Sequence, residues 1–348
     1  MRRGWMDWVP QEVPEDLLRG RVDKVAAACR AQGADALLLY ASFTRPAQVS
    51  ALTHFVPFWS QALLAVAADG RTMLTMATTG RTVQWIRSTS CVDEVLVGHD
   101  IGATVGNWLA DKTPSGVVAV AGLDDLPQSV LAGLRRTLPQ ADPREASGWY
   151  AALEARFHPT PVVAARTQEI ARAGLALVTG RPYLAAHDIV AAIDAHCRAA
   201  GAEEVAVALA PDLDRSTVLR RLEGNAPLGA RFAVQASVAY KGCWLRMATS
   251  FRRDGATAVE LPECADARAE LQRGAGATVD ALATRAADVI GARLQDWTLE
   301  ARRGGLPLAT VAVAGRPATS EVPAFSTLSL QLCAGGAGFV LAEPLAFS

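Results

Sequence analysis

The sequence predicts an α/β domain over residues 1–145 followed by an α+β domain over residues 161–348. Three observations support this prediction. The chain has 348 residues, which is more than one hydrophobic core usually serves. Helical and strand-like patterns alternate along its first part, whereas helices and strands come in groups along its second part. Between the two, residues 146–160 are predicted to form a connector.

The first domain begins with apolar residues at helical spacing over 17–32, and a strand is expected over 36–40. Asp69-Gly70 lies between the apolar runs 62–67 and 72–76. Because this residue pair tolerates positive φ, it predicts a β-hairpin. The alternation then continues with strands at 92–97 and 117–121 and helices near 101–109 and 128–138.

The connector is marked by a shift toward Pro, Ala, Arg and aromatic residues between Pro139 and Pro161, with room for one short helix. Beyond it, Gly180-Arg181-Pro182 separates two long helical patterns, and a third contains a break at Gly274 and Gly276. For this domain we expect helices at 161–179, 185–200 and 265–297 and strands at 204–209, 231–240, 244–251, 310–313, 327–332 and 338–347.

Composition and charge argue against several classes of protein. The 34 Lys+Arg and 35 Asp+Glu residues leave a net charge of −1, so no basic excess indicates nucleic-acid binding. Apolar residues make up 51%, which is enough for buried cores and atypical of a disordered chain. The six cysteines are dispersed without a C-x-x-C pair, so neither a zinc knuckle nor a disulfide framework is expected. No stretch approaches about 18 uninterrupted apolar residues, and we predict a cytoplasmic protein without a membrane span.

Several motifs resemble those of one superfamily. Arg166-Thr-Gln-Glu169-Ile170 is similar to the start of its catalytic domain, and the spacing from Gly229 to Phe251 resembles its antiparallel hairpin. The other matching segments are Leu328-Ser-Leu-Gln331, Gly338-Phe-Val-Leu-Ala342-Glu343 and, in the first domain, Ala51-Leu-Thr-His54-Phe55. On these motifs the chain resembles the creatinase, Xaa-Pro aminopeptidase and prolidase (M24-like) superfamily. The resemblance implies a creatinase-type N-terminal α/β domain followed by a C-terminal pita-bread domain.

Metal-dependent members of this superfamily hold two divalent ions with two aspartates, a histidine and two glutamates, because hard dications need several carboxylate oxygens. The matching positions here hold Gln235, Arg246, Gln331 and either Ala342 or, with a shift of one residue, Glu343. The ligand histidine would follow Gly304, where this chain has no histidine. The resemblance therefore implies neither a metal site nor another cofactor.

Metal-free relatives, creatinase and ectoine hydrolase, use a histidine base about a dozen residues before Gly229. The corresponding stretch 212–221 contains no histidine, so that mechanism does not carry over either. Any chemistry in this chain would have to be divergent.

The resemblance implies three catalytic candidates. Arg246 would be a fixed cation that holds an anionic substrate, or alternatively part of an internal salt bridge that fills an inactive site. Glu343, in apolar surroundings, would move protons. His54 lies where, in creatinase-like dimers, the first domain reaches the active site of the partner.

Five further residues are candidates for substrate binding. Gln235 and Gln331 offer donors and acceptors for an amide or a carboxylate, or could be neutral fillers that bond each other. Tyr240 and Trp244 follow the aromatic positions around a glycine turn, where packing is the commoner role. Arg215 belongs to an arginine-rich rim, which would make the site positively charged where that of the relatives is acidic.

Two hypotheses follow. The first is a metal-independent enzyme of the pita-bread fold that hydrolyses a C–N bond, or performs a related elimination or cyclisation, in a small anionic or amide-containing metabolite. The alternative is a pseudoenzyme that uses the pita-bread cavity to bind a ligand or a protein. The expected partner is a small carboxylate-bearing molecule, with no nucleic acid and no membrane, and the resemblance implies a homodimer.

Overall fold

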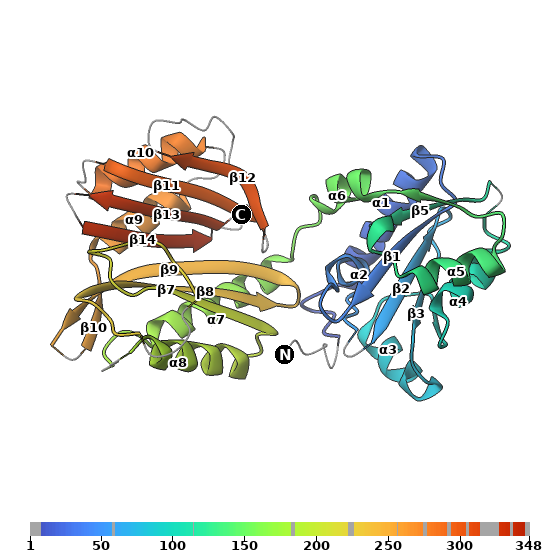
Figure 1. Cartoon of the computed structure of the whole chain (residues 1–348), viewed down its shortest axis with the longest axis horizontal. Coiled ribbons are helices and arrows are strands. Elements are labelled where there is room, and N and C mark those ends of the chain that lie inside the picture. Colours follow the sequence, from blue (N-terminus) through green and yellow to red (C-terminus); the bar gives the residue numbers. More distant parts are fainter. Residues whose placement is uncertain are drawn as a thin grey trace. The chain divides into compact units, whose positions relative to one another are not determined.

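The computed structural model of the chain describes residues 8–57, 60–113, 115–181, 185–221, 226–255, 257–273, 277–290, 294–303, 306–313, 327–334 and 337–344. It separates into two compact units, Met1–Thr160 and Pro161–Ser348 (Figure 1). Both units combine helices with a β-sheet, which confirms the predicted fold class. Among the described helices, none has the length and apolar character needed to cross a membrane.

The first unit is built on a six-stranded sheet in the order β4-β3-β2-β1-β5-β6. Strand β2 is antiparallel to both of its neighbours, and the other adjacent pairs are parallel. The elements in chain order are α1 (Glu15–Ala31), β1 (Ala36–Ser42), α2 (Ala47–Thr53), β2 (Gln61–Ala67), β3 (Thr72–Met76), α3 (Val83–Thr89), β4 (Glu94–Val97), α4 (Ile101–Leu109), β5 (Val117–Ala121), α5 (Gln128–Thr137), β6 (Asp142–Glu145) and α6 (Ser147–Glu154).

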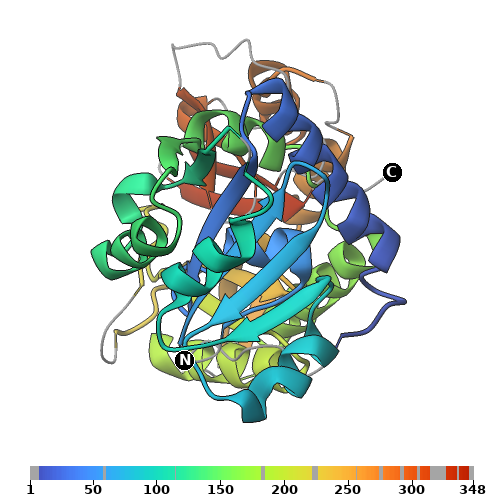
Figure 2. The same ribbon diagram turned by 90° about the vertical axis from the view of Figure 1, so that its right-hand side faces the viewer.

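Helices cover both faces of this sheet. Leu37 and Leu39 of β1 pack in the cluster that contains α1 and α2, whereas Leu38 packs in the cluster that contains α4 and α5. Successive side chains of a strand point to opposite faces, so an unbroken apolar run is what a sheet covered on both faces requires. Figure 1 shows the two pairs of helices on either side of the sheet, and Figure 2 shows the same blue-to-cyan strands after a turn of 90°.

The segment predicted as a connector folds onto the first unit. Within it, Tyr150 of α6 is fully buried and its hydroxyl donates to the carbonyl of Gln48 at 3.2 Å. Arg21 of α1 donates to the carbonyl of His158 at 2.6 Å, and the Thr160 hydroxyl donates to the carbonyl of Glu12 at 2.7 Å. Residues up to Thr160 therefore contribute to the core and the polar contacts of the first unit.

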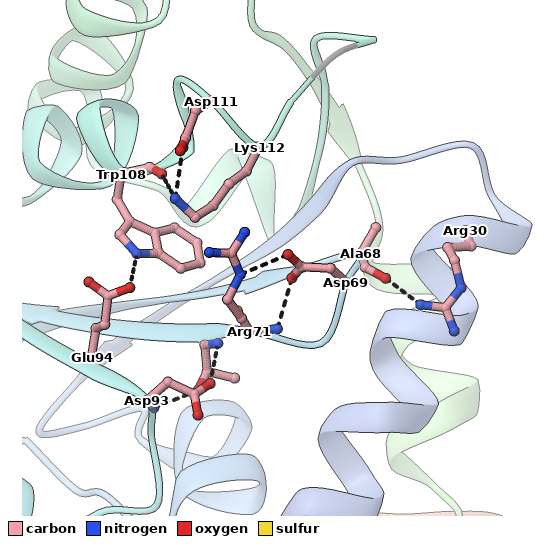
Figure 3. Close-up of polar contacts among 10 residues, drawn as sticks. Arg30, Ala68, Asp69, Arg71, Asp93, Glu94, Trp108, Asp111 and Lys112 are labelled. Atoms are coloured by element: carbon pink, nitrogen blue, oxygen red, sulfur yellow. Dashed lines mark hydrogen bonds and ion pairs between the residues drawn. The ribbon is translucent and has the colours of Figure 1, made fainter.

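Polar contacts join the starts of strands β3 and β4 to each other and tie β4 to helix α4 (Figure 3). Asp93 accepts hydrogen bonds from the backbone N–H of Thr72 and from the Arg19 guanidinium, both at 2.7 Å. Burial raises the pKa of Asp93, but these bonds outweigh it and hold the pKa below its usual value. The indole N–H of Trp108 in α4 donates to Glu94 in β4 at 2.8 Å. These contacts join α1 and α4 to the same edge of the sheet.

Glu145, at the end of β6, fixes the loop that follows β5. Its carboxylate accepts the backbone N–H groups of Leu123 at 2.7 Å and Ser147 at 2.6 Å. Burial raises the pKa of Glu145, but the bonds from Ser147 and Leu123 outweigh burial and lower it from 4.5 to about 2. A carboxyl group whose pKa is lowered in the folded state stabilises the protein at pH values above its unfolded-state pKa. This stabilisation is lost as pH falls toward 2. We expect the Tm deficit of Glu145→Gln to be present at pH 7 and to shrink as pH falls from 4.5 to 2.

Glu154→Gln is the matched control for this pH titration. Burial raises the pKa of Glu154, so its effect on stability has the opposite pH dependence. As pH rises, ionisation of this carboxyl destabilises the folded protein. We therefore expect Glu154→Gln to gain stability relative to the wild type at higher pH. A Tm deficit of Glu145→Gln that stays constant between pH 2 and pH 7 would contradict the role given to Glu145.

The second unit is built on an eight-stranded sheet in the order β12-β11-β13-β14-β9-β8-β7, with β10 paired to β9. Its adjacent strands are antiparallel. The elements in chain order are α7 (Pro161–Ala176), α8 (Ala186–Ala199), β7 (Glu204–Ala210), β8 (Arg231–Tyr240), β9 (Cys243–Asp254), β10 (Thr257–Glu260), α9 (Glu263–Gln272), α10 (Val279–Ile290), β11 (Leu294–Arg303), β12 (Leu306–Val313), β13 (Thr327–Ala334) and β14 (Ala337–Pro344).

The predicted helical stretch over 265–297, with its break at Gly274 and Gly276, corresponds to two helices, α9 and α10. Its end is wrong, because strand β11 begins at Leu294. Leu, Glu, Ala and Arg in this strand favour a helix locally, but β11 pairs with β12 on one side and with β13 on the other. These non-local hydrogen bonds override the local preference.

Apart from β10 and β12, the second unit contains the same succession twice, namely two helices, a strand and then a β-hairpin. Strands β7, β8 and β9 occupy one half of the sheet, and β11, β13 and β14 occupy the other in mirrored order. The two halves meet where β14 pairs with β9. Figure 1 shows the two sets of strands side by side in this unit.

The two faces of this sheet differ. Phe232 and Val234 of β8 pack with Ile170 of α7 and Ile189 of α8, and we call this side the helix face. The alternate, odd-numbered residues of β8 point to the opposite side of the sheet. We call that second side the far face, and it carries Gln235 and Ser237 of β8 with their register partners Ala248 and Arg246 of β9.

Candidate functional site

One row of the far face crosses three adjacent strands. Gln235 of β8 pairs with Ala248 of β9, and Ala248 pairs with Ala342 of β14. Paired residues of neighbouring strands project to the same side of a sheet. Gln235 is only 8% exposed, so its carboxamide lies largely within the protein. The register thus brings Gln235 and Ala342, two positions that the resemblance matches to metal ligands, into a single row.

Arg246 lies in the next row of the far face. It is opposite Ser237, and its Nε donates to the Ser237 hydroxyl at 3.2 Å. Gln235 and Arg246 are diagonal neighbours on adjacent strands, with backbones roughly 7–8 Å apart. The far face therefore places a guanidinium, a hydroxyl and a carboxamide at neighbouring positions of two adjacent strands.

Glu343 does not share this face, so it is not the partner of Arg246 in the internal salt bridge considered for that residue, and its predicted place beside Arg246 is wrong. Since Ala342 projects to the far face, its neighbour Glu343 projects to the helix face, where it is 1% exposed. Its carboxylate lies 3.3 Å from Arg172 of α7 and 3.2 Å from Arg268 of α9, and it accepts a hydrogen bond from Gln272 at 3.0 Å. Glu343 is therefore part of the packing between helices and sheet, and it cannot move protons on the far face.

Burial raises the pKa of Glu343, and the attraction of Arg268 and Arg172 does not fully offset that effect. The network extends further along the helix face. Arg268 also bonds Glu260, and Glu260 accepts the hydroxyl of Thr249 at 2.6 Å. A single arginine of α9 thus bridges carboxylates from both halves of the sheet.

The two predicted aromatic residues are on opposite faces. Trp244 pairs with Ala239 and is half-buried on the far face, two residues before Arg246. Tyr240 packs against the cluster that lies under α7 and α8, so it does not share a face with Gln235 and Arg246 and has the packing role considered for it. Strand alternation is again the physical reason, because Tyr240 is an odd number of positions from Gln235 and Ser237.

The loop between β7 and β8 packs against the far face. Leu209 and Arg220 exchange two backbone hydrogen bonds of 3.0 Å, which close this loop. Leu213 is 1% exposed and packs with Ala233, Ala248 and Ala342. The backbone N–H of Gly338 donates to the carbonyl of Leu213 at 3.1 Å, an approach that a Cβ at position 338 would obstruct. Small apolar residues and a leucine therefore surround Ala342, from which the row continues to Ser329 of β13 and Glu300 of β11.

A pair of divalent ions does not fit these residues. The described ligand positions offer one amide oxygen from Gln235, a positive charge from Arg246 and a methyl group from Ala342. Hard dications require several carboxylate or carbonyl oxygens, and a neighbouring guanidinium repels them. In the described part of the chain, no group of three or more His, Cys, Asp or Glu side chains could hold a metal ion.

The remaining predicted residues lie elsewhere. Arg215 is in the β7–β8 loop with its side chain 87% exposed, and it pairs with Asp212 at 3.3 Å. His54 ends α2 of the first unit in a left-handed conformation with φ of 63° and is 2% exposed, with Nδ1 3.4 Å from the carbonyl of Thr89. Gln331 pairs through its backbone with Val340 of β14, and its side chain lies outside the described residues.

Sequence reasoning missed Ser237, which orients Arg246. The strand period of two was the available signal, since Ser237 is two residues after Gln235 and must share its face. It also missed Leu213, whose place in the loop depends on long-range contacts with β14.

Solved structures match this arrangement over nearly the whole chain, although no protein-family model and no curated protein match the sequence. The Xaa-Pro aminopeptidase of Thermotoga maritima has a TM-score of 0.67 at 14% identity, over 91% of this chain and 94% of that chain. The chain has the pita-bread fold. The Xaa-Pro dipeptidase of Bacillus anthracis has a TM-score of 0.62 at 14% identity, over 95% of each chain. The prolidase of Pyrococcus furiosus has a TM-score of 0.62 at 11% identity, over 93% of this chain and 95% of that chain.

The TM-scores and coverages establish the pita-bread fold. The sequence identities are too low to indicate the chemistry, which has to be judged from the residues of the site. The peptidases cover both units of the chain, so the likeness includes the first unit as well as the pita-bread unit. Within this shared fold, the residues of the far face decide what the unit can bind.

Proposed function

We propose that the pita-bread unit binds a small carboxylate-bearing molecule on the far face without a resident metal ion. The observation that supports this most directly is Arg246, a cation oriented by Ser237 beside the carboxamide of Gln235. A guanidinium binds a carboxylate through two parallel, charge-assisted hydrogen bonds. Gln235 can donate to and accept from a further polar group of the same molecule.

Hydrolysis of a C–N bond in the bound molecule is the second candidate function. It is favoured by the likeness to aminopeptidases and prolidases over nearly the whole chain. Glu343 takes no part in this candidate, because its carboxylate lies on the helix face. Mass spectrometry of compounds incubated with the protein separates the two candidates, since only the second predicts cleavage products.

The test of the proposed function is Arg246→Gln, which removes the cation and keeps a polar side chain. We expect small carboxylates such as propionate to raise the Tm of the wild type and to have no effect on this variant. Arg215→Gln is the matched control, because this exposed arginine pairs with Asp212 outside the row. Its response to propionate should equal that of the wild type.

Metal analysis of the purified protein completes this test. We expect no stoichiometric divalent metal. Two bound divalent ions per chain, or an equal response of the wild type and Arg246→Gln to every carboxylate, would overturn the proposed function.

A further inference from the structure

We infer that this site selects N-acylated α-amino acids over free amino acids. The inference rests on the proposed function, because it assumes that Arg246 holds the carboxylate of the ligand. It goes further by assigning a partner to the second half of the same molecule.

The first step of the argument is the spacing of the two polar groups. Gln235 is opposite Ala248 and Arg246 is opposite Ser237, so their side chains rise from diagonal positions of one face. Such positions are roughly 7–8 Å apart, a distance that long side chains can span. In an N-acyl α-amino acid a single carbon separates the carboxylate from the amide nitrogen. Long side chains at Arg246 and Gln235 can therefore contact the two groups of one such ligand.

The second step is the charge of the site. A free amino acid carries an ammonium group beside its carboxylate, and binding the carboxylate to Arg246 brings two positive charges together. This repulsion is strong where burial lowers the effective dielectric constant, as at Gln235, which is 8% exposed. Acylation removes the positive charge, and the neutral carboxamide of Gln235 supplies no charge that would compensate an ammonium group.

The third step is the complementarity of the two amides. The carboxamide of Gln235 has one acceptor oxygen and an NH₂ donor group, and the acylamide has one N–H donor and one carbonyl acceptor. A free amine in its charged form offers donors only. Gln235 can therefore pair with either polar group of an acylamide, by accepting from its N–H or by donating to its carbonyl.

Trp244 adds a contact for the rest of the ligand. It is half-buried on the same face, two residues before Arg246 along β9. An aromatic ring beside the carboxylate position gives apolar surface to an amino-acid side chain. This favours an alanine or larger side chain over glycine.

Isothermal titration calorimetry with three matched probes tests the inference. The probes are N-acetyl-L-alanine, L-alanine and propionate, which share the carboxylate and differ at the neighbouring position. We expect N-acetyl-L-alanine to bind at least tenfold more tightly than L-alanine, with propionate between them. Arg246→Gln should abolish binding of all three probes.

Gln235→Glu provides a test that does not depend on loss of function. Its carboxylate would attract the ammonium of L-alanine, so we expect the preference to reverse toward the free amino acid. Gln235→Leu should lower the affinity for N-acetyl-L-alanine to that for propionate and leave propionate unchanged. Thermal unfolding of each variant verifies that it is folded.

The outcomes separate the inference from the function on which it rests. If L-alanine binds as tightly as N-acetyl-L-alanine, or if propionate does, the inference is overturned and the carboxylate site stands. If none of the three probes binds to the wild type, the proposed function itself fails. An unchanged preference in folded Gln235→Glu would also overturn the inference.

Discussion

Replacing Glu343 by alanine is expected to lower the free energy of unfolding by about 3–5 kcal/mol, the usual cost of removing one partner from a buried ion pair. The reason is that Arg268 and Gln272 lose the carboxylate between them, and Arg172 loses its contact from the surface of α7. Chemical denaturation followed by circular dichroism measures this loss. A destabilisation below about 1 kcal/mol would contradict the arrangement on the helix face.

Two further variants make this experiment specific. Glu343→Gln keeps an acceptor for Gln272 and removes a charge whose pKa is raised by burial, so we expect it to cost much less than the alanine variant. Because the pKa of Glu343 is raised in the folded state, protonation of this carboxyl favours the folded protein. The free energy of unfolding of the wild type should therefore rise relative to that of Glu343→Gln as pH falls from 7. Glu169→Ala breaks an exposed pair with Arg166 and should cost less than about 1 kcal/mol.

Gly102→Ala is expected to destabilise the first unit by about 1–3 kcal/mol or more. Gly102 is the second residue of α4, and a Cβ there would press on the carbonyl oxygen of Val130 and lie 2.8 Å from its carbonyl carbon. Backbone atoms cannot rotate away as a side chain can, so α4 and α5 would have to separate. Thermal unfolding of the purified variant gives the loss directly.

Gly20→Ala is the matched control for this substitution. Gly20 lies inside α1, and a Cβ at that position meets nothing within 4 Å. Alanine is the better helix former, so we expect a gain of about 0.5–1 kcal/mol. Equal effects of the two substitutions would contradict the close approach of α4 and α5.

Elements with local signals were predictable from the sequence. Asp69-Gly70 predicts the turn between β2 and β3, and the structure places Gly70 there with φ of 93°. The β8–β9 hairpin likewise turns at Lys241 and Gly242, both with positive φ. Such turns depend on a few neighbouring residues, so the sequence around them is sufficient to predict the element.

The face on which a site residue lies was harder to predict. Sequence comparison left Ala342 and Glu343 as alternatives, and a shift of one residue sends a side chain to the opposite side of a sheet. The pairing of Ala342 with Ala248, a residue far away in the chain, decides between them. The face on which Tyr240 lies likewise follows from its contacts with the cluster beneath α7 and α8.

The mirrored order of strands in the second unit has a consequence for how the sheet forms and opens. Within each half the paired strands are close in sequence, whereas the contact between Ala342 and Ala248 closes a loop of more than ninety residues. Long loops lose more chain entropy on closure, so we expect this central pairing to form late in folding. Interactions that form late slow unfolding more than they speed folding. We therefore expect the ion pairs of Glu343 near this junction mainly to lower the unfolding rate of the sheet.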